Sequence, residues 1–458
     1  MTNSQSGRPR FHFTAQSGWL NDPNGLLYCD GEYHLFFQHV PPGWGEPRKC
    51  WGHAVSRDLI HWRELPIAIP ANDDHGPVWS GSAVVDEPNS LGLPPGEGKT
   101  LCAFFTGRKT WAQYLYTSVD RGQTWQSHPG NPVVPMITPG NRDPKVFWHE
   151  PTRRWVMVLW RRRPDNTQKE ESPNGACAIL TSTDLIRWEE RSLNLGFFEC
   201  PDLFELPLID AAGESAATKW VMMDGSGDFV VGAFDGERFT PQTSLLKCEY
   251  GPHFYATQTW NHAPNGRRIQ IAWMRWMSPG QKQADRYPGL PFDQQMSFPC
   301  ELTLRATPDG PRLCRWPVRE IESLRRDGVT AADLTLRPGE APVVAAAGEL
   351  FDAEFSIRPS KTSAGIFVLQ AYGQEIRYDA VRGALSCGGK TANVKPVGGK
   401  LPLRVLVDRT SLEVFAHHGA VSMAMCFVPG SPRTSLRLSA ESSELTIAHK
   451  TFILHRLA

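Results

Sequence analysis

Three acidic residues, far apart in the sequence, stand in similar local surroundings. Asp22 lies between an aromatic segment and the turn-forming Pro23-Asn24-Gly25, Asp143 lies in Arg142-Asp143-Pro144, and a glutamate begins Glu199-Cys200-Pro201-Asp202. Each acid alone is most simply interpreted as a solvated loop residue, because Pro, Asn and Gly are typical of turns. Three acids in one kind of setting instead indicate a shared site.

Two carboxylates on either side of a sugar-sized pocket are the minimum equipment for cleaving a glycosidic bond. One must be ionised near the anomeric carbon, and the other must hold a proton, which requires a pKa raised by burial or a like charge. We expect Arg142 to keep Asp143 ionised and fixed, which suits a residue that grips hydroxyls better than a proton donor. Cys200 beside Glu199 indicates that Glu199 lies in a drier wall of the pocket.

The acids belong to a long, imperfect repeat. Five times, a polar motif leads through a short apolar segment and a turn to a strongly β-prone strand. The motifs begin at Asn21, Trp79, Arg142, Glu199 and Phe254. Repeats of roughly 50–70 residues with about four strands each are typical of β-propeller blades. We therefore predict an all-β protein with a five-bladed propeller, whose inner strands bring the five motifs to one funnel.

A second repeated pattern, Ser-x-Asp followed by Trp, falls between these copies. It occurs at Ser56–Trp62, Ser118–Trp125 and Ser182–Trp188. The Asp and the residues after it indicate a turn, and the Trp opens the next strand. We expect these three tryptophans to pack in the core. A β-sandwich with accidental similarity is the alternative, but the same order of elements recurring five times disfavours it.

The repeat ends near Ser297–Leu302. We assign residues 8–316 to the propeller and residues 317–330 to a linker with one or two helical turns. From about Ala331 the sequence alternates polar and apolar residues between frequent turns, which predicts a C-terminal β-sandwich over residues 331–458. This part has no acidic or aromatic constellation of its own, so a structural or sugar-contacting role is expected.

Charge and cysteine content disfavour several classes of function. The formal net charge is zero and the pI is about 7.2, so no nucleic-acid or anionic-membrane partner is expected. No apolar run approaches the length of a membrane span. The ten cysteines include no Cys-x-x-Cys pair, which argues against structural zinc and favours buried free thiols. The N-terminus lacks an apolar h-region, which predicts a cytoplasmic protein, or a secreted or periplasmic one if a leader has been trimmed.

Together, these motifs resemble glycoside hydrolase family 32, the group of invertases, inulinases and levanases. The resemblance covers essentially the whole chain. It is carried by Trp19-Leu20-Asn21-Asp22-Pro23-Asn24-Gly25, Phe37-Gln38-His39, Trp51-Gly52-His53, Ser80-Gly81-Ser82, Arg142-Asp143-Pro144, Glu199-Cys200-Pro201-Asp202 and Phe254-Tyr255-Ala256.

The resemblance implies a retaining β-fructofuranosidase that needs no metal or organic cofactor. Asp22 would be the nucleophile, Glu199 the acid/base and Asp143 the transition-state stabiliser. By the same resemblance, the fructose pocket would be lined by Asn21, Gln38, Trp44, Trp51, Trp79, Ser80, Arg142 and Tyr255.

We expect an exo-acting fructan β-fructosidase of the levanase or inulinase type that also cleaves sucrose. A sucrose-preferring invertase and a fructosyltransferase are alternatives within the family, and a non-catalytic sugar-binding propeller is an alternative of another class. Retention of all three acids argues against the last, because a lectin needs no proton donor. Trp79, His253 and the loop Val40–Cys50 depart from the commoner family pattern at the expected rim, which leaves open the preference among levan, inulin and sucrose. Oligomeric state cannot be deduced.

Overall fold

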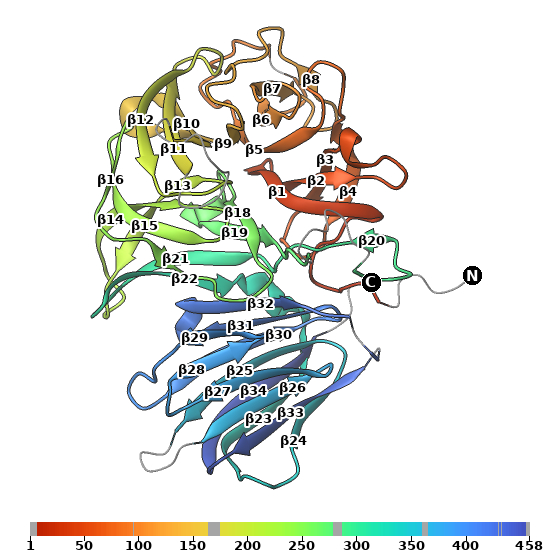
Figure 1. The fold of residues 1–458 in the computed structure, drawn as a ribbon, viewed down its shortest axis with the longest axis vertical. Coiled ribbons are helices and arrows are strands. Elements are labelled where there is room, and N and C mark those ends of the chain that lie inside the picture. Colours follow the sequence, from red (N-terminus) through yellow and green to blue (C-terminus); the bar gives the residue numbers. More distant parts are fainter. Residues whose placement is uncertain are drawn as a thin grey trace.

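The computed structural model describes residues 7–94, 96–163, 175–277, 286–359, 365–428, 430–431 and 433–454. These residues form 34 strands and five short 3₁₀ helices, arranged as a ring of sheets above a pair of sheets (Figure 1). Within the described ranges, no helix has the length and apolar character that crossing a membrane requires.

The N-terminal domain is a ring of mostly antiparallel sheets around a common centre (Figure 1). The first sheet has the order β20-β1-β2-β3-β4, with β1 at Gly18–Cys29, β2 at Glu32–Val40, β3 at Cys50–Ser56, β4 at Arg63–Ile69 and β20 at Phe292–Asp293. The second has β5 at Val78–Val85, β6 at Leu101–Gly107, β7 at Gln113–Ser118 and β8 at Gln126–Ser127. The third has β9 at Arg142–His149, β10 at Arg154–Arg162, β11 at Gly175–Ser182 and β12 at Glu189–Leu195.

The rest of the ring is one nine-stranded sheet made of two antiparallel groups. The first group has β13 at Asp202–Ile209, β14 at Ser215–Met223, β15 at Asp228–Phe234, β16 at Phe239–Pro241 and β17 at Leu246–Lys247. The second has β18 at Tyr255–Thr259, β19 at Ile269–Trp273, β21 at Cys300–Thr307 and β22 at Gly310–Pro317. A short parallel seam joins them, because Leu208 and Ile209 of β13 pair with Leu304 and Arg305 of β21.

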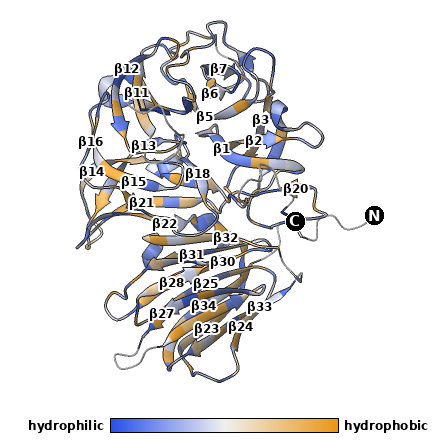
Figure 2. Ribbon diagram, in the orientation of Figure 1, coloured by the Kyte–Doolittle hydropathy of each residue, from blue (hydrophilic) through white to orange (hydrophobic). Residues whose placement is uncertain are grey.

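Burial along each sheet explains the ring. The strands β3, β6 and β11 are buried at every residue, whereas the outer strand β12 is buried at none. A strand that is apolar on both faces must be covered on both faces, so each sheet packs against the next. The clusters that join successive parts of the ring contain Phe36 with Phe105, Phe104 with Trp155, Trp160 with Met222, Phe204 with Leu304, and Phe37 with Trp260. Figure 2 shows the same concentration of apolar residues in the strands.

The repeated Ser-x-Asp turns have one construction. Asp58 accepts hydrogen bonds from the backbone N–H groups of Ile60 and His61, and the indole of Trp62 donates to the Leu59 carbonyl oxygen at 3.1 Å. The turns at Asp120 and Asp184 are capped in the same manner, and Trp125 and Trp188 pack against the apolar clusters as Trp62 does. The expectation that these tryptophans serve packing is therefore confirmed.

The C-terminal domain is a sandwich of two six-stranded sheets that enclose a single large apolar cluster. One sheet holds β23 at Arg325–Leu336, β34 at Leu445–Leu454, β25 at Phe351–Arg358, β30 at Leu401–Val407, β31 at Ser411–Ala416 and β32 at Val421–Cys426. The other holds β24 at Val343–Gly348, β33 at Thr434–Glu441, β26 at Ile366–Ala371, β27 at Gln374–Asp379, β28 at Ala384–Cys387 and β29 at Lys390–Asn393.

The passage between the domains differs from the expected linker. A 3₁₀ helix, η4, occupies Arg319–Leu324, and β23 begins at Arg325, so the expected boundary at residue 331 falls inside a strand. The first residues of β23 are polar and mostly exposed, because this strand is at the edge of its sheet and pairs only with β34 there. They lack the apolar alternation by which a strand is recognised. All ten cysteines are free and buried, as expected.

Candidate active site

A cavity of about 660 Å³ lies where the N-terminal ends of the inner strands meet. The inner strands touch one another around the ring, β1 with β5 and β18, and β5 with β9. Asp22 is the fifth residue of β1, Asp143 the second of β9, and Glu199 lies just before β13. The funnel predicted from the repeat therefore exists, and all three acids line it.

Asp22 is fixed by a chain of short hydrogen bonds. Its Oδ2 accepts the Ser80 hydroxyl at 2.5 Å, and its Oδ1 accepts the Asn21 amide at 3.1 Å. Gln38 joins the chain, because its Nε2 donates to Ser80 Oγ at 2.7 Å and its Oε1 accepts from Asn21 at 2.5 Å. Burial raises the pKa of Asp22, and the Ser80 hydroxyl offsets part of that rise.

Asp143 is almost fully buried beside the other two acids. Its Oδ2 accepts the backbone N–H of Cys200 at 3.0 Å, and the Cys200 Sγ lies 3.6 Å from the same oxygen and 3.9 Å from Asp22 Oδ2. Burial raises the pKa of Asp143 to about 7 against the lowering effect of Arg142, and the charges of Glu199 and Asp22 add to the rise. Arg142 therefore lowers the pKa of Asp143 as expected, but burial and the two neighbouring carboxylates outweigh it, so Arg142 alone does not keep Asp143 ionised.

Arg142 is directed at Glu199 instead. Its Nε and Nη2 donate to Glu199 Oε1 at 2.9 and 2.6 Å, whereas its Nε lies 4.0 Å from Asp143 Oδ2. The guanidinium lies 3.9 Å over the ring of Trp160 and donates to the Gly140 carbonyl, which fixes its plane. The Tyr255 hydroxyl donates to the other carboxylate oxygen, Oε2.

Glu199 does not lie in a dry wall. Its side chain is 24% exposed, against 4% for Asp143, and the buried neighbour is Cys200. The backbone is left-handed at Asp143, Glu199 and Cys200, with φ of 63°, 48° and 43°. Non-glycine residues in this region carry strain of about 1–3 kcal/mol each, and such residues cluster at functional sites.

The cavity contains five of the eight residues expected to bind substrate, namely Asn21, Gln38, Trp79, Arg142 and Tyr255. Ser80 has no exposed surface but contacts Asp22 directly. Trp51 and Trp44 do not line the cavity. The antiparallel register opposite Gln38 buries Trp51 between two sheets, where its indole donates to the Trp79 carbonyl at 2.9 Å. Trp44 lies beneath Arg48, 4.4 Å from its guanidinium.

Other lining residues were not among those expected to bind substrate. They are Trp19, Glu46, Pro47, Lys49, Pro77, Arg108, Trp273, Arg275 and Met277. Lys49 Nζ lies 3.1 Å from Glu46 Oε1, within the loop already noted as unusual. Arg108 follows β6 and Arg275 follows β19, the antiparallel partners of inner strands, so both return to the end that carries the motifs. The sequence signal that could have found them is a basic residue just after the second strand of a repeat.

These two arginines stand on aromatic rings. Arg108 lies 5.1 Å from the ring of Trp79 and 4.2 Å from that of Trp111. Arg275 lies 4.8 Å from the ring of Tyr255. Stacked guanidinium and indole planes present flat surfaces with outward donors, which suit the faces and hydroxyls of a sugar.

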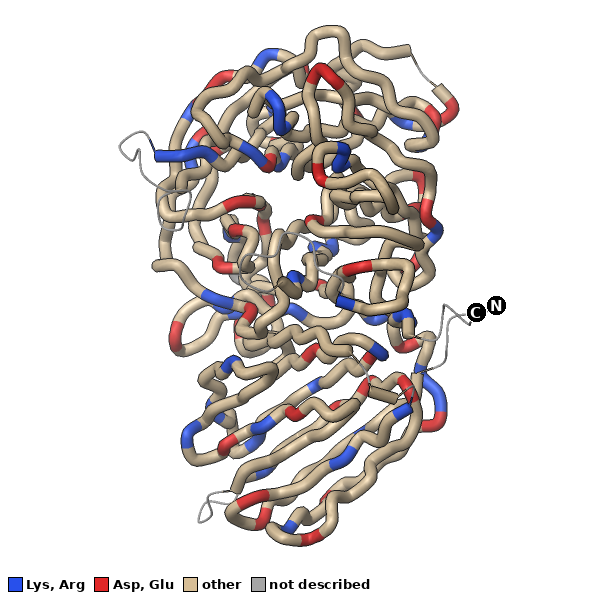
Figure 3. Tube along the Cα trace, turned by 45° about the vertical axis from the view of Figure 1, so that its right-hand side comes forward, with Lys and Arg blue, Asp and Glu red and all other residues tan. Residues whose placement is uncertain are grey.

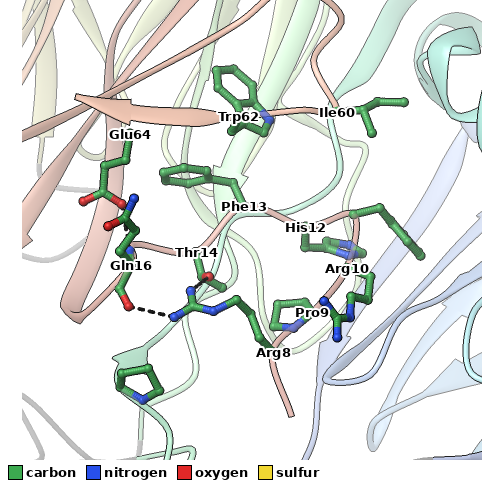
Figure 4. A pocket seen from close by; sticks show the side chains of 12 residues that line it. Arg8, Pro9, Arg10, His12, Phe13, Thr14, Gln16, Ile60, Trp62 and Glu64 are labelled. Carbon is green, nitrogen blue, oxygen red and sulfur yellow. Dashed lines mark hydrogen bonds between the residues drawn. The ribbon is translucent and has the colours of Figure 1, made fainter. Parts of the chain in front are cut away.

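The rest of the surface offers a weaker candidate. A cavity of about 600 Å³ lies beside the N-terminal segment, and Arg8 extends across it to Thr14 and Gln16 (Figure 4). Among the described residues that line it, Glu64 is the one acid, and it accepts the Gln16 N–H at 2.7 Å. Charges of both signs are scattered over both domains in the view of Figure 3. Among the described residues, no three His, Cys, Asp or Glu side chains are grouped so that they could hold a metal ion.

Two family models match the chain, the glycosyl hydrolases family 32 N-terminal domain over residues 12–317 and the family 32 C-terminal domain over residues 320–453. A levanase of Bacillus subtilis (strain 168) is 36% identical over 501 residues, which cover 98% of this chain and 70% of the levanase. An extracellular exo-inulinase of Aspergillus awamori is 30% identical over 520 residues, covering 95% of this chain and 92% of the relative.

Solved structures agree with these matches. The crystal structure of exo-inulinase from Aspergillus awamori superimposes with a TM-score of 0.83 and 26% identity over all of both chains. The β-fructofuranosidase from Schwanniomyces occidentalis, complexed with fructosyl-erythritol, gives a TM-score of 0.84 and 25% identity, over 100% of this chain and 99% of the other.

Proposed function

The chain belongs to glycosyl hydrolase family 32, and from that premise we propose a retaining exo-β-fructosidase that releases terminal β-D-fructofuranosyl residues from fructans and sucrose. The observation that carries this proposal is the meeting of Asp22, Asp143 and Glu199 in one cavity, from β1, β9 and the loop before β13. The names of the relatives, levanase and exo-inulinase, support fructans as the substrate class.

In the first half of the reaction, Asp22 is the nucleophile. Its carboxylate attacks the anomeric carbon of the terminal fructosyl unit, while Glu199 gives a proton to the departing glycosidic oxygen. The carbon–oxygen bond breaks, the leaving group departs as an alcohol, and a fructosyl ester of Asp22 remains. The donors from Asn21 and Ser80 hold the Asp22 carboxylate in the attacking position.

In the second half, Glu199 acts as a base. It takes a proton from water, the resulting hydroxide attacks the anomeric carbon, and the Asp22 carboxylate is released. Arg142 and Tyr255 hold both oxygens of Glu199 through each half, so the proton is given and taken at one place. Asp143 grips ring hydroxyls and favours the transition state by orientation.

Exo-attack follows from the shape of the ring. The middle of the ring is filled, because the Asn261 amide donates to the carbonyl oxygens of Ala83 and Val146, at 2.9 and 3.0 Å, from two inner strands. We propose that the ring has five blades, in which the two groups of the nine-stranded sheet are separate blades joined by the β13–β21 seam. A cavity with a filled floor accepts a chain end and leaves no exit for a chain that runs through.

The alternatives within the family differ in what resolves the fructosyl ester. A fructosyltransferase uses a sugar in place of water, and an invertase prefers sucrose as the donor. The stacked pairs of Arg108 with Trp79 and of Arg275 with Tyr255 flank the cavity and are the walls that a leaving or accepting sugar would meet. A lectin-like role is disfavoured, because a protein that only binds sugar needs no proton donor at the Glu199 position.

The test is a time course of products from sucrose, inulin and levan, each supplied separately. We expect fructose as the only early product from both polymers, with a slow fall in polymer length. Oligofructosides of intermediate length before free fructose would overturn exo-action, and longer oligomers at high sucrose would indicate transfer. Asp22→Asn, which keeps the shape of the side chain but not its charge, is the inactive reference.

A further inference from the structure

A fully buried polar cluster lies among the inner strands, next to the candidate catalytic residues in sequence. Lys145 Nζ lies 3.2 Å from Asp202 Oδ2, and their side chains are 1% and 0% exposed. Both contact Thr259: Lys145 Nζ donates to its carbonyl oxygen at 2.6 Å, and Asp202 Oδ2 accepts its backbone N–H at 2.7 Å and its hydroxyl at 2.9 Å. The cluster does not line the cavity.

Each member shares a strand or a strand entrance with a residue of the cavity. Lys145 follows Asp143 on β9, with one residue between them. Asp202 opens β13, directly after the loop that carries Glu199. Thr259 ends β18, which Tyr255 begins. The three contacts of the cluster therefore tie together the three strands that deliver Asp143, Glu199 and the tyrosine that holds Glu199.

Packing alone does not explain an ion pair at this place. Removing two charges from water costs several kcal/mol per ion, and well-packed apolar residues often replace buried ion pairs without loss of stability. Asp202 Oδ1 also accepts no hydrogen bond from any residue that the structure describes. A nearby cation, Arg268, is held by the Trp260 carbonyl at 3.3 Å and lies over Phe204.

The ion pair fixes the positions of the three strands relative to one another. Ionic and hydrogen-bonded contacts depend on distance and direction, whereas apolar contacts allow sliding. The left-handed backbone at Asp143, Glu199 and Cys200 persists only where surrounding contacts over-determine it. The cluster lies just beyond these residues on both chain segments, where it can hold them.

We propose that Lys145 and Asp202 are positioning residues, which hold Asp143 and Glu199 in their reacting geometry without touching substrate. This inference rests on the function proposed above. A misplacement of about 1 Å at a reacting group can cost about 100-fold in rate. Loss of the pair should therefore lower turnover more than it lowers stability.

The main variant is the neutral double substitution Lys145→Met with Asp202→Asn, which removes both charges of the pair together. We expect kcat on sucrose to fall about 100-fold, with KM within about threefold and a cooperative thermal transition retained. The loss on an activated aryl fructoside should be smaller, because that leaving group needs less help from Glu199. A double variant that folds with wild-type kcat would overturn the proposal.

The matched control is a second buried cluster, in the sandwich, where Asp352 accepts Arg404 at 2.8 Å and Arg325 at 2.7 Å. Arg404→Met with Asp352→Asn removes comparable charges far from the cavity and should lower the melting temperature without changing kcat. An equal loss of kcat in this control would mean that the effect is general destabilisation. Wild-type enzyme without activity on sucrose, inulin and levan would instead refute the proposed function, so the two failures are distinguishable.

Thr259→Val is a milder variant in case the double substitution does not fold. It removes one donor to Asp202 but keeps the backbone N–H bond and the side-chain shape. We expect a severalfold fall in kcat with the same bias against sucrose relative to the aryl fructoside. A Thr259→Val enzyme with unchanged kcat on both substrates would also contradict the proposal.

Discussion

At the scale of single residues, each of the three acids accepts hydrogen bonds from its own set of donors. Ser80 and Asn21 donate to Asp22, and Arg142 and Tyr255 donate to Glu199. Asp143 accepts a hydrogen bond from the backbone N–H of Cys200. Asp22 and Glu199 are thus oriented by side chains that substitution can remove one at a time, so their roles can be separated experimentally.

The first prediction concerns Glu199 as the proton donor. Glu199→Gln keeps the acceptor for Arg142 but cannot give a proton to the leaving oxygen. Activity on sucrose and inulin should fall by about 100- to 10,000-fold, the usual contribution of general acid–base catalysis, and much less on an activated aryl fructoside. Comparison of kcat/KM on the three substrates checks this. Glu205→Gln, an exposed acid on β13, is the control, and equal losses on all substrates for Glu199→Gln would indicate a binding role.

The second prediction concerns the pH profile. The Ser80 hydroxyl lowers the pKa of Asp22, which burial has raised, so Ser80→Ala should raise that pKa further. Because the nucleophile must be ionised, the acid limb of kcat/KM should move to higher pH, and activity at pH 5 should fall more than activity at pH 7. Ser182→Ala, which alters a buried serine in a remote turn, should leave the limb in place. An unchanged limb in Ser80→Ala would mean that another acid controls it, such as Asp143, whose pKa is about 7.

At the scale of elements, the repeated motifs could be predicted from the sequence. The direction of a side chain that depends on strand register could not. The repeats were recognisable because each has a polar motif and buried strands, and three of them add an Asx-type turn closed by Trp62, Trp125 or Trp188. The acids were recognisable because the motifs recur in phase. Nothing in the local pattern reveals which face of β3 carries Trp51, since a side chain reverses with a shift of one residue.

The partner of Arg142 was hidden for a related reason. Sequence neighbours suggested Asp143, but the two side chains leave β9 in different directions, and the guanidinium reaches the loop before β13. Long-range pairing of this kind follows from the packing of blades and not from any one strand. The start of β23 could not be recognised because the first residues of this strand are polar.

The third prediction compares two tryptophans near the rim of the cavity, one on a strand and one in a loop. Trp79 lines the cavity from β5 and stacks beneath Arg108, whereas Trp44 lies away from the cavity beneath Arg48. Trp79→Ala should raise KM for sucrose about tenfold, equivalent to about 1.4 kcal/mol of lost binding. Trp44→Ala should leave KM within about twofold. Initial-rate kinetics on both variants check this, and a larger effect at Trp44 than at Trp79 would show that the loop Val40–Cys50 closes over substrate.

At the scale of the whole molecule, buried polar contacts dock the sandwich on the propeller. Arg315 of β22 pairs with Glu249 and donates to Ser422 of β32 at 2.8 Å. A second junction involves the N-terminal segment, where the His12 ring lies between Asp408 and Glu413, with Nδ1 and Nε2 at 2.9 and 2.8 Å from their oxygens. The two domains are therefore joined by groups whose charge depends on pH.

The His12 junction leads to the last prediction, a loss of stability at alkaline pH. Burial opposes protonation of His12, but the hydrogen bonds and charges of Asp408 and Glu413 outweigh it and raise its pKa to about 9. In the unfolded chain this pKa is about 6.5, so the folded state holds the extra proton between these values. The resulting stability is complete below about pH 6.5 and is lost as pH rises through about 9, with an upper bound of about 3 kcal/mol.

Denaturant unfolding at a series of pH values measures the contribution of His12 to the free energy of unfolding. The wild-type free energy of unfolding should fall between pH 7 and pH 10, and His12→Gln should be less stable at pH 7 and nearly flat over the same range. The control is His75→Gln, because burial lowers the pKa of His75 and leaves it without a charge to lose in this range. If His12→Gln retains the wild-type slope, the alkaline loss comes from other groups. If the slope disappears while kcat at pH 7 stays unchanged, the junction stabilises the docking of the two domains independently of catalysis.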